Sequence, residues 1–234
     1  MPPEQLPLPE YPEADAPGDR LPERIAPMQP ADAPAPFDDP DYLFEPWWPG
    51  VRASAFAERG RVRLQVAGLA DADTAFPELR ELPGQLAEDG VALDGTLLVL
   101  DPEGRPDADL LRARLTGSER GAGRAAYVAA DLLWAGGESV LKRTFRIRRD
   151  WLGRILAPGD RITVGHGYVG DGTLVAEALA RLGIEGLSGR RLSARHRAGV
   201  AGDAWLRMPV TPAEPRARPT LALLLRLPLG DSQA

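Results

Sequence analysis

The spacing of hydrophobic residues changes along the chain, and each change marks a predicted element. Apolar and polar positions alternate over residues 51–56 and again over 62–66, with Glu58-Arg59-Gly60-Arg61 between them. A period of two on both sides of a glycine-containing turn is typical of a β-hairpin. Residues 91–100 and 126–134 are almost continuously apolar, which favours buried strands.

Segments with helical spacing of apolar residues lie between these strands and after them. A threonine with proline in the first turn predicts a helix from Thr74, although Pro83-Gly84 interrupts its apolar face. A short helix is predicted at about 107–116, and another at about 143–156 with Ile147 on its buried side.

The last third of the chain also combines helix and strand patterns. Asp171 predicts the N-cap of a helix that Gly183 ends. Strand-like segments are predicted near residues 160–164, 184–187, 204–208 and 221–227. Because strands and helices do not alternate regularly, the pattern favours an α+β fold with largely antiparallel sheets.

Residues 1–41 differ from the rest in composition. They hold twelve of the 24 prolines, and ten acids against Arg20 and Arg24 give them a charge of −8. Since the whole chain is −6, residues 42–234 carry +2. The prolines predict an extended arm without helix or paired strand. We therefore expect a tail (1–41), a folded domain (42–212) and a C-terminal extension with a possible final strand (213–234).

Composition excludes several kinds of chemistry. Without cysteine, the chain has no disulfide, thiolate nucleophile or cysteine-based metal site, and His166 and His196 are far apart in sequence. Lys142 is the sole lysine, so any amine nucleophile must be Lys142, although a solvated surface lysine is the simpler interpretation. No apolar run approaches the roughly 20 residues of a membrane span, and the N-terminus does not resemble a signal peptide. The expected location is the cytoplasm.

One stretch resembles a known motif. Residues 45–52, Glu-Pro-Trp-Trp-Pro-Gly-Val-Arg, resemble the Glu-Pro-Lys-Trp-Asp-Gly-Phe-Arg motif of ATP-dependent DNA ligases of bacterial end-joining systems, whose lysine attacks the α-phosphate of ATP. Further fragments follow in the family's order: Phe76-Pro77-Glu78-Leu79, Leu93-Asp94-Gly95, Tyr127-Val128-Ala129, Glu185-Gly186 and Trp205-Leu206. The resemblance covers Ile25 to Pro209. It implies an adenylation domain, with two mainly antiparallel sheets flanked by helices and a nucleotide cleft between them.

The departures from the family fall on residues that carry its chemistry. Trp47 stands at the position of the lysine and Pro49 at that of the aspartate. Thr96 replaces a glutamate that in the family contacts the ribose or helps to hold metal, and Ala130 replaces the aromatic ring that stacks on adenine. Loss of that ring is expected to cost about 1–3 kcal/mol of nucleotide binding.

Other motif positions are only partly kept. Ala67 stands where an arginine is expected, and Arg190 and Arg207 stand where the family has lysines. Among the positions expected to carry chemistry, Glu45, Arg52 and Glu185 are kept, and Gly50 also matches the motif. After Pro209 only 25 residues remain, too few for the DNA-clamping OB domain of the family, so we expect none.

Arginine is concentrated in the second half of the chain. From residue 143 onward there are fifteen arginines and eight acids. Such runs are solvated helix faces about as often as phosphate contacts. The candidate phosphate or DNA contacts are Arg143, Arg146, Arg149, Arg191, Arg195 and Arg197.

Three function classes stay open. The first is a catalytically inactive ligase homologue, a noncatalytic module that binds DNA or DNA-repair proteins. The second is a nucleotide-binding or nucleotidyltransferase enzyme of the ligase type with altered chemistry, which would need ATP and Mg²⁺. The third is a scaffold without a nucleic-acid role. The first is favoured. It implies that the protein needs no cofactor, has no metal site and has no membrane partner, and that Trp47 or Trp48 fills the cleft. It also implies weak, non-specific DNA binding that the acidic tail reduces.

Overall fold

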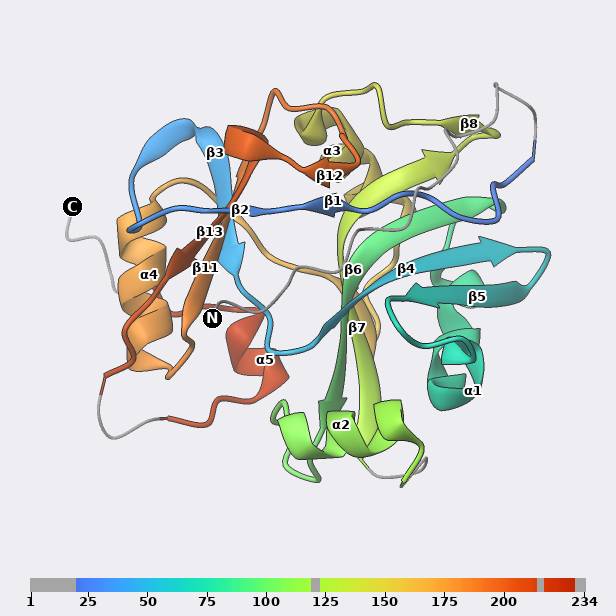
Figure 1. Cartoon of the computed structure of the whole chain (residues 1–234), viewed down its shortest axis with the longest axis horizontal. Helices are drawn as coiled ribbons and strands as arrows, with labels where there is room; N and C mark the ends of the chain where they lie inside the picture. The colour runs from blue at the N-terminus through green and yellow to red at the C-terminus, as the bar shows by residue number, and fades with distance from the viewer. Residues whose placement is uncertain (1–19, 119–122, 214–216, 230–234) are drawn as a thin grey trace, which may run out of the picture.

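Two β-sheets lie side by side, with helices on their outer faces (Figure 1). The computed structural model describes residues 20–118, 123–213 and 217–229. The larger sheet has the order β5-β4-β6-β7-β8, and β9 pairs with β7. Its strands are β4 (Val51–Glu58), β5 (Arg61–Val66), β6 (Val91–Leu100), β7 (Arg124–Ala135), β8 (Glu138–Ser139) and β9 (Ile162–Val164).

The second sheet has the order β10-β3-β11-β13-β2. Its strands are β2 (Ala31–Asp32), β3 (Asp39–Pro46), β10 (Tyr168–Gly170), β11 (Gly186–Arg191) and β13 (Trp205–Pro209). A separate parallel pair joins β1 (Met28–Gln29) to β12 (Gly199–Val200). Most pairings in the two large sheets are antiparallel, which confirms the predicted α+β class.

Helices close the outer faces of both sheets. In Figure 1, α2 lies across the lower ends of β6 and β7, α1 lies beside β5, and α4 and α5 lie at the second sheet. The helices are α1 (Ala72–Ala75), η1 (Pro77–Gln85), α2 (Ala108–Thr116), α3 (Phe145–Ile155), α4 (Gly172–Arg181), η2 (Gly202–Ala204) and α5 (Leu221–Leu224).

Local chemistry explains where α2 begins and ends. The Asp107 side chain accepts hydrogen bonds from the backbone N–H groups of Asp109 and Leu110, which satisfies donors that the first helical turn leaves unpaired. Gly117 ends the helix in the left-handed region (φ 73°), where a residue without Cβ is favoured.

The hairpin β4–β5, the buried strands β6 and β7, and the helices α2 to α4 lie where the sequence predicts them. Three local predictions were wrong. The segment from Thr74 forms a short helix and then the 3₁₀ helix η1, because Pro83 lies inside it. Ile147 is 46% exposed, since α3 instead buries Arg148 and Arg149 beside Leu152.

The third wrong prediction is the final strand. Residues 221–224 form α5, because the Thr220 hydroxyl accepts a hydrogen bond from Leu223 N and caps the turn. Leu221, Leu224 and Leu227 pack into the core beneath the second sheet. For α4, the Asp171 side chain makes no capping hydrogen bond, and Asp38 accepts from Thr173 N at 2.8 Å instead.

The predicted extended arm, residues 1–41, is too long. Residues 28–32 contain two paired strands, β1 and β2, and Ile25 and Met28 are buried. The prolines are compatible with this pairing because they fall between the short strands, where no N–H is needed for a ladder. Pro27 still accepts a hydrogen bond from Gly199 N. Residues 39–41 already belong to β3, so the folded domain begins before residue 42. Residues 1–19 lie outside the described residues, and for them the extended arm remains a prediction.

Residues 22–32 form an extended strap that crosses the front of the molecule (blue in Figure 1). Within the described ranges, no helix is long and apolar enough to cross a membrane.

Candidate functional site

The turn between β3 and β4 carries the motif-like stretch. Gly50 lies against β6, where a Cβ would approach Leu97 O to 2.2 Å, so only glycine fits this close contact. The turn therefore brings Trp47 and Trp48 to the gap between the two sheets.

Trp48 fills much of this gap. It is 7% exposed and belongs to the same apolar cluster as Leu98 on β6 and Val128 on β7. The prediction that a tryptophan packs against the strands bearing Thr96 and Ala130 is confirmed for Trp48. What remains is a cavity of about 70 Å³, whereas small-molecule sites usually occupy about 300–1,000 Å³.

Trp47 packs toward the second sheet instead. Its ring centroid lies 6.1 Å from that of Trp205, with an angle of 32° between the planes. The guanidinium of Arg207 lies 4.8 Å from the Trp47 ring, and those of Arg52 and Arg190 lie 4.6 and 4.0 Å from the Trp205 ring. Such cation–π contacts stabilise the stack and hold both indoles in place.

A chain of ion pairs runs below the stack. Arg52 donates to both carboxylate oxygens of Asp94, at 2.8 and 2.7 Å. Arg190 lies between two carboxylates, 3.6 Å from Asp94 and 3.3 Å from Asp131. Arg148 donates to both oxygens of Asp131, at 2.8 and 2.7 Å. Paired, bidentate geometry is what makes burial of so many charges tolerable.

Glu45 has its own arginine. Its Oε1 lies 2.5 Å from Nη2 of Arg149, which also donates to the carbonyl oxygens of Ala130 (2.7 Å) and Gly165. With this pair, four arginines compensate three carboxylates in and below the cleft. We call these seven residues the buried ion-pair network: Glu45, Arg52, Asp94, Asp131, Arg148, Arg149 and Arg190.

The pKa values of two members of the network are shifted. Burial alone would raise the pKa of Asp94, but Arg52 and Arg190 outweigh burial, and the pKa lies below its ordinary value. Burial lowers the pKa of Arg190, while Asp131 and Asp94 oppose that change. Both groups are therefore charged at neutral pH.

The structure brings many of the predicted pocket residues together. Glu45, Trp47, Arg52, Thr96, Ala130 and Arg190 all line the small cavity. Ala67 and Arg207 line a neighbouring groove. Pro49 and Glu185 are exposed and are not among the residues that line the cavity.

The cleft does not fit the cofactors that the resemblance implies. A cavity of about 70 Å³ is too small for a nucleoside triphosphate, and Trp48 occupies the adjoining space. Mg²⁺ prefers carboxylate oxygens, but the carboxylates here are engaged by arginines. The described residues contain no group of three metal-ligating side chains.

A second cluster of arginines lies on the surface. The loop after β11 is hydrogen-bonded to the start of α3, through Phe145 N to Ala194 O (2.7 Å), Arg146 N to Leu192 O (2.9 Å) and His196 N to Leu141 O (3.0 Å). These bonds bring together five exposed basic side chains, which we call the basic surface: Lys142, Arg143, Arg146, Arg195 and Arg197.

Within the described part of the chain, only Arg143 of this surface has an ion pair, to exposed Glu138 at 3.4 Å. Two predicted phosphate contacts do not belong to the surface. Arg149 is turned inward to Glu45. Arg191 donates to the Tyr42 hydroxyl at 3.0 Å and pairs with Asp203. The arginine-rich sequence alone does not distinguish arginines that pair inside the fold from arginines exposed to solvent, because it gives no information on burial.

Sequence reasoning missed several members of the cleft. The matching fragments include Asp94 but assign it no partner, and they do not point to Asp131, although an acid inside a buried strand signals a partner. The arginine-rich run gives no sign that Arg148 is buried. Trp205 donates a 2.9 Å hydrogen bond to Ser188 Oγ and closes the side of the cavity, and no local pattern pointed to that contact.

Comparison with known proteins finds relatives among DNA ligases. No family model matches the chain. It is 31% identical over 166 residues to the multifunctional non-homologous end joining DNA repair protein LigD of Mycobacterium tuberculosis, covering 71% of this chain and 21% of LigD. It is 31% identical over 175 residues to a probable DNA ligase of Streptomyces griseus, covering 68% of this chain and 34% of that protein. The chain thus spans about a fifth of LigD.

Solved structures of DNA ligases resemble this fold. The mycobacterial DNA ligase D complexed with ATP and MES superposes with a TM-score of 0.67 and 28% identity, over 79% of this chain and 60% of that chain. The chain is therefore a homologue of the ligase domain of LigD, with the fold of an ATP-dependent DNA ligase adenylation domain.

Proposed function

We propose that this chain is a noncatalytic, ligase-like module that binds duplex DNA through its basic surface and forms no covalent adenylate. The observation that carries the proposal is the contrast between a filled cleft and a free surface. The cleft beside the motif-like turn holds Trp48 and the buried ion-pair network, while the basic surface has four side chains without an ion pair in the described ranges.

Catalysis lacks its nucleophile in this arrangement. Position 47 holds an indole, and the sole lysine, Lys142, is exposed on the basic surface and does not line the cavity. Arg52 and Arg190 could offset charge on a phosphate, but both already pair with carboxylates. The alternative, a ligase-type nucleotidyltransferase with altered chemistry, would require both the indole stack and these ion pairs to rearrange.

DNA binding needs only cations at the surface. Each phosphate neutralised by Lys or Arg releases counterions, so log K falls by about 0.9 per contact as log salt rises. The expected dissociation constants for non-specific binding are about 10⁻⁴ to 10⁻⁶ M. A DNA-repair protein as a further partner remains part of the proposal.

Fluorescence anisotropy with a blunt duplex tests the DNA role. The triple variant Arg146→Ala/Arg195→Ala/Arg197→Ala should bind more weakly, and its salt slope should fall by about 0.9 for each lost contact. A matched control removes three exposed arginines elsewhere: Arg80, Arg112 and Arg181. Equal loss of affinity in both variants, or no binding by the wild type at low salt, contradicts the proposal.

A further inference from the structure

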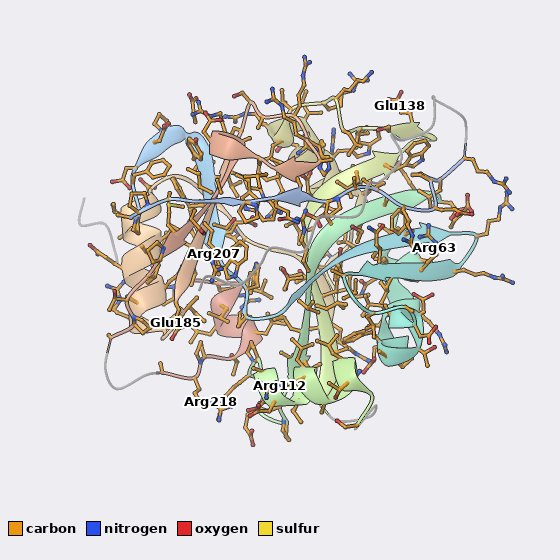
Figure 2. All side chains as sticks on the ribbon, viewed as in Figure 1. Arg63, Arg112, Glu138, Glu185, Arg207 and Arg218 are labelled. Carbon is orange, nitrogen blue, oxygen red and sulfur yellow. The ribbon has the colours of Figure 1, made fainter. Side chains whose placement is uncertain are left out.

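A second hollow lies beside the filled cleft. It has a volume of about 1040 Å³ and lies between the strap and strands β4 and β5. Loop residues 66–70 form part of its wall, and Trp47, Trp205 and Arg207 lie at its end. Figure 2 labels Arg207, from β13, and Arg63, from β5, on the two sides of this front groove.

The walls of the front groove are tied together by specific hydrogen bonds. Arg63 donates to the carbonyl oxygens of Pro22 (3.0 Å) and Glu23. Gln65 accepts from Ile25 N at 3.3 Å and donates to Ile25 O at 3.2 Å. The strap is thereby fixed above the sheet, and the groove is a defined feature of the fold.

The lining offers both cations and flat surfaces. Four arginines line it: Arg24, Arg52, Arg63 and Arg207. Arg52 is already paired with Asp94, so three of them, Arg24, Arg63 and Arg207, can meet a ligand. Arg207 is exposed and stacks on the partly buried ring of Trp47. Indole rings and guanidinium planes are surfaces on which unpaired bases stack.

The groove is also continuous with the basic surface. The strap passes beside the loop that carries Arg195 and Arg197, through contacts of Ala26 O with His196 Nε2 (3.0 Å) and of Pro27 O with Gly199 N (3.0 Å). A DNA molecule held on the basic surface can therefore continue toward the groove without leaving the protein.

We propose that the front groove binds an unpaired DNA strand that extends from a duplex on the basic surface. This inference rests on the proposed function. The volume is close to the upper end of about 300–1,000 Å³ for small-molecule sites, which is room for a short stretch of one strand and not for a duplex. Phosphates lie against Arg24, Arg63 and Arg207, and a base stacks at Arg207 and Trp47.

The test compares two labelled DNAs with the full chain by anisotropy. One is a blunt duplex, and the other is the same duplex with a short single-stranded thymidine extension. Stacking of one base is worth about 1–3 kcal/mol, so the extended DNA should bind about fivefold tighter or better. Ala67→Glu adds an anionic side chain at the groove without removing a packed one, and it should abolish this preference while leaving blunt-duplex binding unchanged.

Matched variants separate the groove from general charge effects. Arg207→Ala should reduce the preference, whereas Arg112→Ala, on α2 at the lower edge of the molecule in Figure 2, should not. Ala87→Glu, exposed and outside the groove, is the control for Ala67→Glu. Circular dichroism of each variant checks that it is folded.

Equal binding of both DNAs by the wild type overturns the groove proposal and leaves the proposed function intact, whereas no binding of either DNA overturns both. A preference that survives Ala67→Glu also rejects the groove. If tryptophan fluorescence responds to a free peptide with the acidic sequence of residues 1–19 and not to single-stranded thymidine, the groove is a peptide site and the DNA assignment is wrong.

Discussion

Arginine serves two different purposes in two neighbouring regions of this protein. In the buried ion-pair network, Arg148 and Arg190 are almost inaccessible and lie against Asp131. On the basic surface, Arg146 and Arg195 project into solvent. The same side chain holds the two sheets together in the first region and is free to meet a phosphate in the second. Pairing, and not the number of arginines, decides which role is available.

The largest expected difference concerns stability. Asp131→Asn removes the charge that Arg148 and Arg190 share, and breaking a buried pair in this way costs about 3–5 kcal/mol. Asp109→Asn breaks the exposed Asp109–Arg112 pair and should leave the free energy of unfolding almost unchanged. Urea unfolding measures both, and similar losses for the two variants would remove the distinction between the regions.

Two glycines, one beside the cleft and one on the exposed side of α3, give a second, smaller contrast. Gly50→Ala forces a Cβ against Leu97 O in the cleft, and overpacking of this kind costs about 1–3 kcal/mol. Gly153→Ala, on the exposed side of α3, meets no atom within 4 Å. It should stabilise the helix by about 0.5–1 kcal/mol. Opposite shifts of the melting temperature are expected, and a shift in the same direction would show that the turn at Gly50 can relax.

The smallest effect lies between the two regions, at His196. Burial lowers the pKa of His196, although the hydrogen bond to Ala26 O and the charges of Asp131 and Asp94 oppose this. The unfolded chain then binds a proton more readily, so stability is complete above the unfolded pKa of about 6.5 and declines as pH falls below it. The pH dependence should be shallower in His196→Gln, and identical slopes between pH 7 and 5 would rule out this contribution.

Much of the fold follows from local patterns. The alternation in 51–66 and the apolar runs of β6 and β7 predict the larger sheet, because strand periodicity depends on neighbours in sequence. The sequence predicts a strand where α5 forms, because a short leucine-rich segment has no decisive period.

Less of the candidate site could be predicted from the sequence. The resemblance located Trp47, Thr96 and Ala130, which line one cavity. It did not reveal that Arg149 reaches Glu45 across 104 positions of sequence. Contacts of this kind depend on how the two sheets pack, which no local pattern specifies.

The most direct test of the central claim, that the ligase-type cleft is closed and without a nucleophile, is incubation of the full chain with α-labelled ATP and Mg²⁺ or Mn²⁺, followed by denaturing electrophoresis. The account predicts no label on the protein, while an active ligase in parallel becomes labelled. Label that remains on this protein and disappears in Lys142→Ala would contradict it, because the sole lysine would then reach a nucleotide.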